Sequence, residues 1–325
     1  MVSCRNYTFL QQTSTIYFHM AYIRAAGIGP QSIALKGVVE MKIGLIGAGK
    51  VGFSLGRYFC ENQIPVTGYC SRSSDSAREA ANFTGTAWFT ELQDLVERSD
   101  ILFVTTSDAA IDDVWAQLQN LPIENKIICH CSGSLSSGIF SEIQKRKAYG
   151  YSVHPLLAIS SKETGYQLMQ DAVFAIEGDD EDLETMVSLF RRLGNPVQTI
   201  SKEQKTLYHC AAVTVSNHVL ALLDSGISML MQCGFDRDAA RNALAPLIRG
   251  NVESALRNDV VQSLTGPVER CDQETVSGHL QSLSDQPEQQ MLYGLLAKRL
   301  TDIASVKHPQ RDYSELRTML GDLFL

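Results

Sequence analysis

The chain has 325 residues, enough for about two domains, and 44% of them are hydrophobic, which excludes a disordered protein. Its 28 Lys and Arg stand against 36 Asp and Glu, a net charge of −8, and this acidic balance argues against a nucleic-acid partner. No stretch of about 20 apolar residues is free of charge, so the sequence predicts no membrane span and no membrane partner.

Eight cysteines are scattered along the chain without a CxxC pair. A disulfide scaffold would be shorter and richer in cysteine, and a zinc site would show paired spacing. We therefore expect reduced, mostly buried thiols in a reducing compartment, and hence a cytoplasmic protein. The cysteines are Cys4, Cys60, Cys70, Cys129, Cys131, Cys210, Cys233 and Cys271.

Residues 1–40 show neither the alternation of a strand nor a sustained helical stripe. We interpret them as an extension outside the fold, with Met41 as the first residue of the folded chain. They contain Arg5 and Arg24 but no acidic residue before Glu40, so a targeting segment is the alternative.

A strand, a glycine-rich turn and a helix follow Met41 in that order. Residues 42–46 form a short apolar run, and the GxGxxG turn after them opens a helical stretch that ends near Phe59. In such a turn the first glycine permits the bend, the second lets the backbone approach a diphosphate, and the third packs the helix on the strand. A second strand, predicted at 65–70, completes the context for dinucleotide binding. The turn residues are Gly47, Ala48, Gly49, Lys50, Val51 and Gly52.

The end of the second strand indicates which dinucleotide binds. An NAD site has an acidic residue there that holds the ribose 2′-hydroxyl, whereas this chain has Ser71, Arg72 and Ser73. An arginine flanked by hydroxyls suits a 2′-phosphate, because its guanidinium can bond two phosphate oxygens. We therefore predict NADP as the cofactor. In the alternative, Arg72 is a solvated loop residue, Asp75 reaches the ribose and the cofactor is NAD.

Strands and helices continue to alternate up to residue 200. This alternation predicts an α/β fold, a doubly wound and mostly parallel Rossmann sheet of about eight strands, with ligands beyond the strands' carboxyl ends. Thr105 and Thr106, at the end of one strand, are therefore assigned to the cofactor as well. The further strands are predicted at 100–106, 126–131, 148–154, 173–177 and 197–200, and the helices at 88–96, 112–118, 134–146 and 181–193.

From residue 202 onward only helices are predicted, so the domains are expected at 41–201 and 202–325. Residues 203–232 are apolar nearly all round, as in a central buried helix. Asp236 and Asp272 suit helix N-caps, and Pro287 suits the first turn of a helix that ends near Lys307. The helix after Asp236 is expected to be interrupted by Pro246 and to run to about Asn258. A loop at 264–271 precedes the Asp272 helix, and a last helix is expected at 313–323.

Polar side chains follow two neighbouring strands of the predicted sheet. Ser132 comes after the strand at 126–131, and His154 ends the next strand just before Pro155. Ser132 could bond a substrate oxygen, and His154 could exchange a proton with the reacting group as a hydride moves. In the alternative, His154 only caps the strand end. Cys129, His130 and Cys131 cannot converge on a metal, because neighbouring residues of a strand point to opposite faces, so we expect none.

The first long helix of the second domain carries a polar line. At about 100° per residue, His209 and Ser216 lie within about 40° of Lys205, and Asn217 lies at the margin of that side. Lys205, His209 and Asn217 are therefore candidates for substrate contacts, with hydrogen bonds to the first domain as the alternative. Thr265 and Gly266 precede a helix N-terminus that would suit an anion.

With these residues considered, the chain resembles the Rossmann-like proteins that carry a DUF2520 C-terminal domain. The resemblance rests on GLIGAGKVG, SRS, HCSGSLSS, HPLLAI, FAIEGDDEDLE, YHCAAVTVSNHVLALL and LTGPVERCDQETVSGHL, and covers nearly all of residues 41–325. That family is similar to prephenate dehydrogenase, pyrroline-5-carboxylate reductase and 6-phosphogluconate dehydrogenase. Prephenate dehydrogenases carry a serine after one strand and a catalytic His-Pro pair after the next, a pattern that Ser132 and His154-Pro155 match. Hydroxyacid dehydrogenases place Asn four residues after a helical Lys, whereas here His209 follows Lys205.

The resemblance implies a reaction class but no metabolite, and it implies a homodimer paired through the helical domain. We expect an NADP-dependent oxidoreductase that moves a hydride between nicotinamide and a small carbonyl, alcohol or imine in a cleft between the domains. His154 would be the acid or base, Ser132 the residue that orients the substrate, and Lys205, His209 and Asn217 its further contacts. The alternative is a non-catalytic NADP-binding protein with a regulatory or scaffold role.

Overall fold

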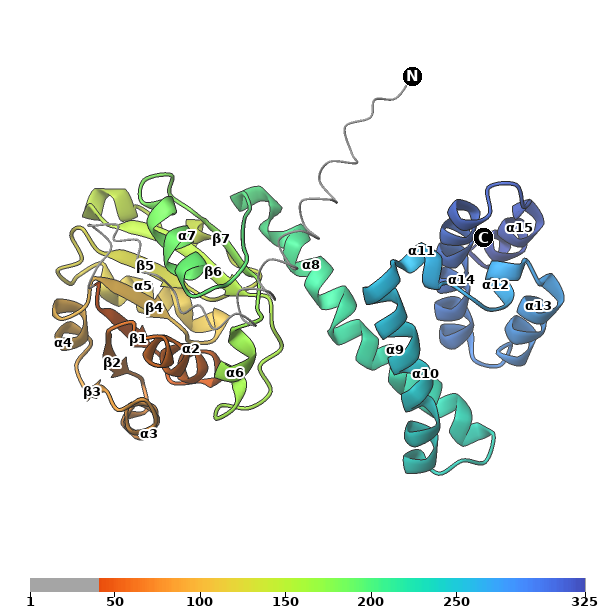
Figure 1. The fold of residues 1–325 in the computed structure, drawn as a ribbon, viewed down its shortest axis with the longest axis horizontal. Coiled ribbons are helices and arrows are strands. Elements are labelled where there is room, and N and C mark those ends of the chain that lie inside the picture. The colour runs from red at the N-terminus through yellow and green to blue at the C-terminus, as the bar shows by residue number, and fades with distance from the viewer. Residues whose placement is uncertain (1–40, 325) are drawn as a thin grey trace, which may run out of the picture. The chain divides into compact units, whose positions relative to one another are not determined.

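The computed structural model describes residues 41–324, and the interpretation of residues 1–40 as an extension lies outside them. The chain divides into two compact units, with the boundary between His209 and Cys210. The first unit is built on a β-sheet and the second consists of helices (Figure 1). We describe each unit by itself.

The first unit contains one eight-stranded sheet with the strand order β3-β2-β1-β4-β5-β6-β7-β8. Neighbouring strands are parallel except for β6 and β7, which are antiparallel. The prediction of a doubly wound, mostly parallel sheet is therefore confirmed. The strands are β1 (Ile43–Ile46), β2 (Val66–Cys70), β3 (Ala87–Phe89), β4 (Ile101–Val104), β5 (Ile127–His130), β6 (Tyr149–Pro155), β7 (Phe174–Gly178) and β8 (Val197–Thr199).

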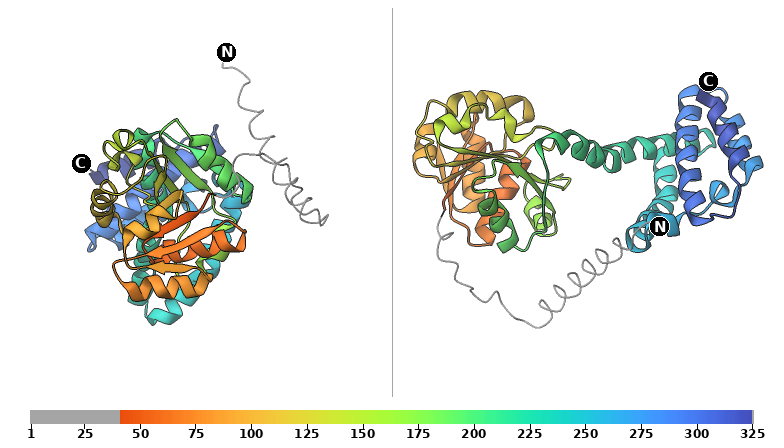
Figure 2. Two further views of the ribbon diagram at one scale, coloured as in Figure 1. Left: turned by 90° about the vertical axis from the view of Figure 1, so that its left-hand side faces the viewer. Right: turned by 90° about the horizontal axis from the view of Figure 1, so that it is seen from above.

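Helices cover both faces of this sheet (Figure 2). On β4, Ile101 and Phe103 belong to one hydrophobic core, and Leu102 and Val104 belong to the other, because alternate strand residues point to opposite faces. Both faces are thus filled, and ligands are left to the ends of the strands. The helices are α2 (Lys50–Glu61), α3 (Ser74–Thr84), α4 (Leu92–Glu97), α5 (Ile111–Leu118), α6 (Gly165–Met169) and α7 (Leu183–Arg192).

Two helix predictions in the first unit are wrong. In place of one helix at 88–96, Trp88 and Phe89 lie in β3, where Trp88 pairs with Tyr69, and only α4 follows. In place of a helix at 134–146, the chain forms two short 3₁₀ turns, Ser137–Ile139 and Ile143–Arg146. Serine hydroxyls accept backbone N–H groups in this segment, and such side-chain bonds compete with a helix.

The second part of the chain is helical, as predicted. The carboxylates of Asp236 and Asp272 accept backbone N–H groups at two helix starts, and Pro287 opens a third helix. The predicted interruption at Pro246 is wrong, because Pro246 lies inside α10, which continues to Asn258. The elements are α8 (Lys205–Val215), α9 (Asn217–Gln232), α10 (Arg237–Asn258), α11 (Val260–Ser263), α12 (Pro267–Arg270), α13 (Gln273–Ser282), α14 (Pro287–Lys307) and α15 (Ser314–Gly321). The loop predicted at 264–271 therefore contains the short helix α12.

The prediction of one central buried helix at 203–232 is wrong in two respects. The helix breaks at Ser216, whose backbone angles of φ −113° and ψ −72° separate α8 from α9. In addition, α9 has no buried residue, and Val215, Leu220 and Met231 are exposed. A helix that is apolar on all sides is expected to be buried. The pattern does not show whether the burying surface belongs to the same chain or to another molecule.

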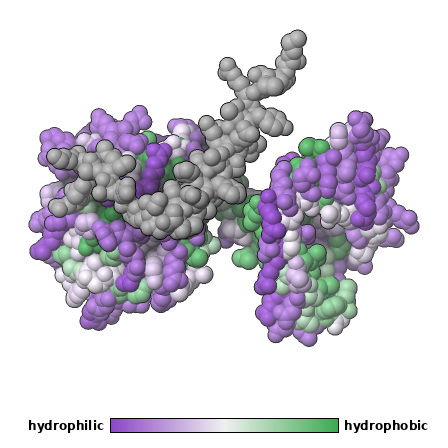
Figure 3. Space-filling view, in the orientation of Figure 1, coloured by the Kyte–Doolittle hydropathy of each residue, from purple (hydrophilic) through white to green (hydrophobic). Residues whose placement is uncertain are grey.

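By length and composition alone, one segment among residues 41–324 is able to cross a membrane. It is Lys202–Gln232, with a mean hydropathy of 1.3 in its most apolar window, none of which is buried. The expectation that no stretch has this composition is therefore wrong. A single segment gives weak support for a membrane protein, because water-soluble helices pass the same test. On the face shown in Figure 3, hydrophobic patches also lie among hydrophilic residues elsewhere in the helical unit.

The cysteines within residues 41–324 are free thiols. Only Cys70 and Cys129 are buried, whereas Cys210 and Cys233 are exposed. The expectation of mostly buried thiols is therefore wrong. The exposed pair lies on the C-terminal helices, where apolar residues are also exposed.

Candidate functional site

The glycine-rich turn between β1 and α2 leaves an open cradle. Gly47 has φ +109°, and a Cβ there would lie 2.9 Å from the carbonyl carbon of Thr105. At Gly52 a Cβ would lie 2.3 Å from Thr105 Oγ1, so these two positions accept only glycine. By contrast, nothing lies within 4 Å of the place where a Cβ of Gly49 would be. The backbone at Gly49 is therefore free to approach a ligand.

Two unpartnered groups line this cradle. The N-cap Gly49 offers no side chain to the first amides of α2, so those N–H groups and the positive end of the helix dipole are available to an anion. Thr106 Oγ1 is buried and has no hydrogen-bond partner in the described part of the chain. Thr105 has a different role. Its hydroxyl donates to the Gly47 carbonyl oxygen at 2.9 Å and so stabilises the turn. The cradle fits a diphosphate.

The residues predicted to select NADP lie at the start of α3. Ser73 is the N-cap of α3, and its hydroxyl accepts the Ser76 N–H at 3.3 Å. Arg72 is exposed and forms no hydrogen bond or ion pair with the residues that the structure describes. The alternative ribose contact, Asp75, is paired with Arg78 at 2.7 Å. An unpaired guanidinium and a paired carboxylate at this place favour a 2′-phosphate.

A second group of polar side chains surrounds His154 at the end of β6. His154 Nδ1 lies 2.7 Å from the Tyr208 hydroxyl on α8, and the two rings meet nearly edge to face. Burial, together with the nearby Lys205 ammonium, lowers the pKa of His154 to about 4. The imidazole is therefore neutral at pH 7, in the form that can accept a proton.

Lys205, on the first turn of α8, is buried with only 1% of its surface exposed. Its Nζ donates a hydrogen bond to Ser152 Oγ at 2.6 Å, and it lies 5.4 Å from the centre of the Tyr208 ring. Burial lowers the pKa of Lys205 to about 8, against the opposing effect of the Glu177 carboxylate. The ammonium therefore carries a positive charge into the interior beside His154.

Ser132 is held by a small network after β5. Its hydroxyl donates to Asp108 Oδ2 at 2.8 Å and accepts the Leu135 N–H at 3.0 Å. The same carboxylate oxygen accepts the Ser134 hydroxyl at 2.9 Å. The Ser132 hydroxyl also accepts the Ser134 N–H at 3.2 Å, so its proton and both of its lone pairs are used to fix this loop.

His130 has a structural role. Its Nδ1 accepts the Ser132 N–H at 3.2 Å, so Nε2 carries the proton and donates to the Ser136 carbonyl oxygen at 3.1 Å. Burial lowers its pKa to about 4, which keeps it neutral. Both ring nitrogens are used within the protein, and the ring fixes the turn that carries Ser132 and Gly133.

His209 joins this group from α8. A Cβ on Gly133 would lie 2.6 Å from His209 Nδ1 and 3.0 Å from His154 Nε2. His209 Nδ1 is buried and has no hydrogen-bond partner in the described chain. The two imidazoles thus pack with one nitrogen each close against Gly133, where a side chain would collide with them.

The sheet topology explains why the cradle and the histidine group lie at one edge. Strands β1, β4, β5 and β6 run parallel, so their carboxyl ends meet at the same edge. The glycine turn follows β1, Thr106 follows β4, Ser132 follows β5 and His154 ends β6.

The structure places most of the predicted site residues in this first unit. Ser132, His154, Lys205 and His209 come together there, whereas Asn217 begins α9 in the second unit, where its side-chain oxygen accepts the Ser216 hydroxyl. Gly266, with φ +101°, precedes α12, which has only four residues. Sequence analysis missed Asp108, Gly133, Ser152 and Tyr208. Tyr208 had one sequence signal, since it lies three residues after Lys205 and so shares its side of the helix.

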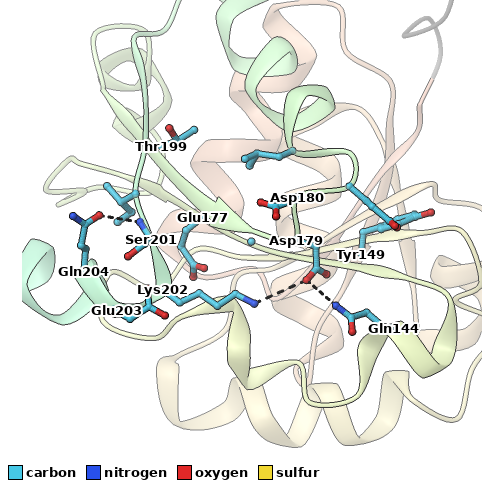
Figure 4. A pocket seen from close by; sticks show the side chains of 14 residues that line it. Gln144, Tyr149, Glu177, Asp179, Asp180, Thr199, Ser201, Lys202, Glu203 and Gln204 are labelled. Atoms are coloured by element: carbon cyan, nitrogen blue, oxygen red, sulfur yellow. Dashed lines mark hydrogen bonds and ion pairs between the residues drawn. The ribbon is translucent and has the colours of Figure 1, made fainter.

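A separate cavity of about 1040 Å³ lies beside the ends of β7 and β8 (Figure 4). Asp179 is central to it, accepting hydrogen bonds from the Gly150 N–H and the Gln144 amide and lying 3.9 Å from Lys202 Nζ. None of the predicted site residues lines this cavity. Within residues 41–324, no three His, Cys, Asp or Glu side chains are grouped so that they could hold a metal ion.

Two family models match the chain. Residues 42–132 match the model described as NADP oxidoreductase, coenzyme F420-dependent, and residues 172–300 match DUF2520, a domain of unknown function. These matches make the Rossmann-like sheet unit similar to NADP oxidoreductases over residues 42–132. More particularly, the chain joins an oxidoreductase Rossmann domain of this type to a DUF2520 domain, as the sequence motifs implied.

The chain is also similar to several known proteins. A Bacillus subtilis protein provisionally named 6-phosphogluconate dehydrogenase YqeC is 28% identical over 58% of this chain, and the chain spans 59% of that relative. Protein TM1727 of Thermotoga maritima is 28% identical, with a TM-score of 0.67 over 82% of this chain and 99% of its own. A Bacteroides fragilis protein provisionally named NADP oxidoreductase BF3122 shares the fold at 24% identity, with a TM-score of 0.62 over 82% of this chain and 100% of its own.

Proposed function

We propose that this protein is an NADP-dependent oxidoreductase that transfers a hydride between nicotinamide and a small carbonyl, alcohol or imine. The observation that carries the proposal is the position of the open glycine cradle and His154 at the same edge of the sheet. The cradle would hold the diphosphate of the coenzyme, and His154 at the same edge would exchange a proton with the substrate. NADPH, when bound, supplies the hydride.

The cofactor part of the proposal assigns a role to each residue of the cradle. The amides of residues 49–52 and the start of α2 would bind the diphosphate, and Thr106 Oγ1 would donate to it. Arg72, with Ser71 and Ser73 beside it, would bind the 2′-phosphate. Thr105 would contribute to cofactor binding indirectly, because its hydrogen bond to Gly47 stabilises the glycine turn.

The catalytic part assigns proton exchange to His154. Its imidazole is neutral at pH 7, so it can take the hydroxyl proton of an alcohol as the hydride leaves the carbinol carbon. In the reverse direction it returns the proton to the new hydroxyl. Ser132 would orient the substrate through the loop that its hydrogen bonds fix, and Lys205 would act by its charge on His154. We propose His209 and Asn217 as further substrate contacts.

We also propose a homodimer paired through the helical region, in the cytoplasm. This proposal is supported by the apolar residues that α9 leaves unburied and by the exposed Leu247 and Leu256 of α10. Such a surface is typical of a protein–protein interface. A second copy of the chain brings the same apolar surface and would cover it symmetrically. Sedimentation at several concentrations tests this, and a monomer at all of them contradicts it.

Calorimetry with NADPH, NADP⁺, NADH and NAD⁺ tests the cofactor, and NADPH oxidation across a panel of keto acids and cyclic imines tests the reaction. We expect binding of the phosphorylated pair and turnover of at least one compound. No heat with either pyridine coenzyme would contradict the proposal. Tight binding without turnover would favour a non-catalytic NADP-binding protein.

A further inference from the structure

Lys50 and Arg72 are two exposed cations beside the glycine turn. Lys50 is the first residue of α2, and Arg72 lies two residues beyond the end of β2. Neither side chain forms a hydrogen bond or an ion pair with another residue in the described range 41–324. Both charges are therefore available to an anion that is not part of the protein.

The position of Lys50 on α2 is electrostatically unfavourable without a ligand. The positive end of a helix dipole lies at the first turn, where acidic residues are stabilising and basic residues are not. The first turn of α2 contains no acidic residue, and its N-cap, Gly49, contributes no side chain. A bound anion reverses this effect, because it compensates both the dipole and the ammonium.

Backbone pairing brings the two cations to the same corner of the sheet. β1 and β2 run parallel with Ile46 opposite Cys70, and the Gly47 N–H donates to the Cys70 carbonyl oxygen at 2.8 Å. The chain therefore leaves the two strands side by side. Lys50 follows four residues after the first strand, and Arg72 follows two residues after the second.

The Lys50 side chain leaves α2 on the side that faces α3. At about 100° per residue, Arg57 lies within about 20° of Lys50 around the helix, and Arg57 donates to the Phe83 carbonyl oxygen on α3 at 3.0 Å. Gly52 lies about 160° from Lys50, where it packs against the chain that follows β4. Since α3 begins just after Arg72, Lys50 lies on the Arg72 side of the glycine turn and away from β4.

The carboxylates of α3 are already engaged with other cations. The pairs are Asp75 with Arg78 at 2.7 Å and Glu79 with Lys162 at 2.9 Å. Glu91 also acts on this corner, since burial and then the Glu91 charge raise the pKa of Cys70. One such carboxylate against two cations and the start of a helix leaves the corner positive.

We propose that Lys50 and Arg72 together bind the 2′-phosphate of NADP, so that Lys50 is a second determinant of the preference for NADP over NAD. This inference rests on the proposed function. A phosphate monoester has three acceptor oxygens and a charge of about −1.5 to −2, so it can pair with a guanidinium through two oxygens and with an ammonium through the third. The diphosphate has other partners, the free N–H groups at the start of α2 and the Thr106 hydroxyl. NAD carries a hydroxyl in place of the phosphate and would leave both cations unpaired.

Calorimetry of the full chain with NADPH and NADH tests the role of Lys50. Lys50→Met should lower NADPH affinity about 10-fold, the effect of losing one hydrogen bond to a charged group, and should change NADH affinity by less than about twofold. Lys50→Arg keeps the charge and should retain most of the affinity. Lys42→Met is the matched control, since Lys42 is also an exposed lysine but lies just before β1, at the opposite end of that strand. It should change neither affinity.

Two further measurements show whether both cations act on one phosphate. The double variant Lys50→Met/Arg72→Ala should bind NADPH and NADH with affinities within about twofold of each other. Added salt should weaken NADPH binding less in Lys50→Met than in the native chain, because one exposed charge contact is gone. The melting temperature without ligand is measured for every variant and should stay unchanged, since both side chains are exposed and unpaired.

The outcomes separate this inference from the proposed function. If Lys50→Met loses as much NADH affinity as NADPH affinity, the ammonium serves the diphosphate and the inference is overturned. Unchanged NADPH affinity in Lys50→Met also overturns it, and so does a native chain that binds NADH as tightly as NADPH. Each of these results leaves the oxidoreductase proposal intact. A native chain that binds neither NADPH nor NADP⁺ overturns the proposed function and this inference with it.

Discussion

His154 Nδ1 and the Tyr208 hydroxyl lie 2.7 Å apart and link the end of β6 to α8. The second unit contains a pair of the same geometry, His279 and Tyr293, also 2.7 Å apart, with rings inclined at 86° in both cases. His279 is exposed, whereas His154 is largely buried beside Lys205. The two pairs share the same hydrogen bond but differ in burial. Comparing them therefore separates the effect of burial on the histidine from the effect of the hydrogen bond.

Replacing Tyr208 by Phe removes this hydrogen bond and keeps the ring. We expect kcat/KM to fall about fivefold, since one such bond contributes about 1 kcal/mol and fixes the orientation of His154. NADPH affinity should stay within about twofold. Steady-state NADPH oxidation measures the change, with Tyr293→Phe as the matched control that leaves kcat unaltered. An equal loss in both variants would show that the effect is not specific to the His154 site.

Replacing His154 by Ala removes the proposed acid or base. Turnover should fall by about 10²- to 10⁴-fold, the usual contribution of general acid–base catalysis, while NADPH affinity changes by no more than a few-fold. Stopped-flow oxidation of bound NADPH and calorimetry on the same preparation check both halves of the prediction. Retained turnover would remove His154 from this role.

The Rossmann unit was predictable because its signals are local. Short stretches of sequence encode the apolar strands, the glycine turn and the polar residues at the strand ends. The structure has each of these features at or near the expected place. The segment after Ser132 was misassigned because its serine hydroxyls bond to the backbone, and this choice between helix and turn depends on contacts such as Ser137 with Glu177.

The candidate site was predictable only in part. Ser132 and His154 could be found, because strand ends in parallel sheets collect functional groups. Gly133 and Asp108 could not, since their roles depend on distances between segments far apart in the sequence, such as the 2.8 Å from Ser132 Oγ to Asp108. Similarly, the apolar composition of α9 gave no information about what covers it.

Arg72→Ala tests the choice of dinucleotide. A guanidinium bound to a 2′-phosphate contributes about 1.5–3 kcal/mol, so NADPH affinity should fall about 10- to 100-fold. NADH affinity should change by less than about twofold, because NADH lacks this phosphate. Arg78→Ala is the matched control, since Arg78 is exposed as well but lies on α3 and pairs with Asp75. Equal losses for NADPH and NADH would contradict the assignment of Arg72.

Lys205→Met tests the buried ammonium through the pH dependence of stability. The pKa of Lys205 is about 8 in the folded chain and 10.5 for an ordinary lysine, so between these values the unfolded chain binds more protons. Stability then rises with pH as far as this group is concerned. The cost of burying the charge is fully present below pH 8 and is lost by about pH 10.5. Urea unfolding of both proteins at pH 7 and pH 10 should therefore show the native chain gaining on Lys205→Met at the higher pH. A constant difference in the free energy of unfolding would contradict the lowered pKa of Lys205.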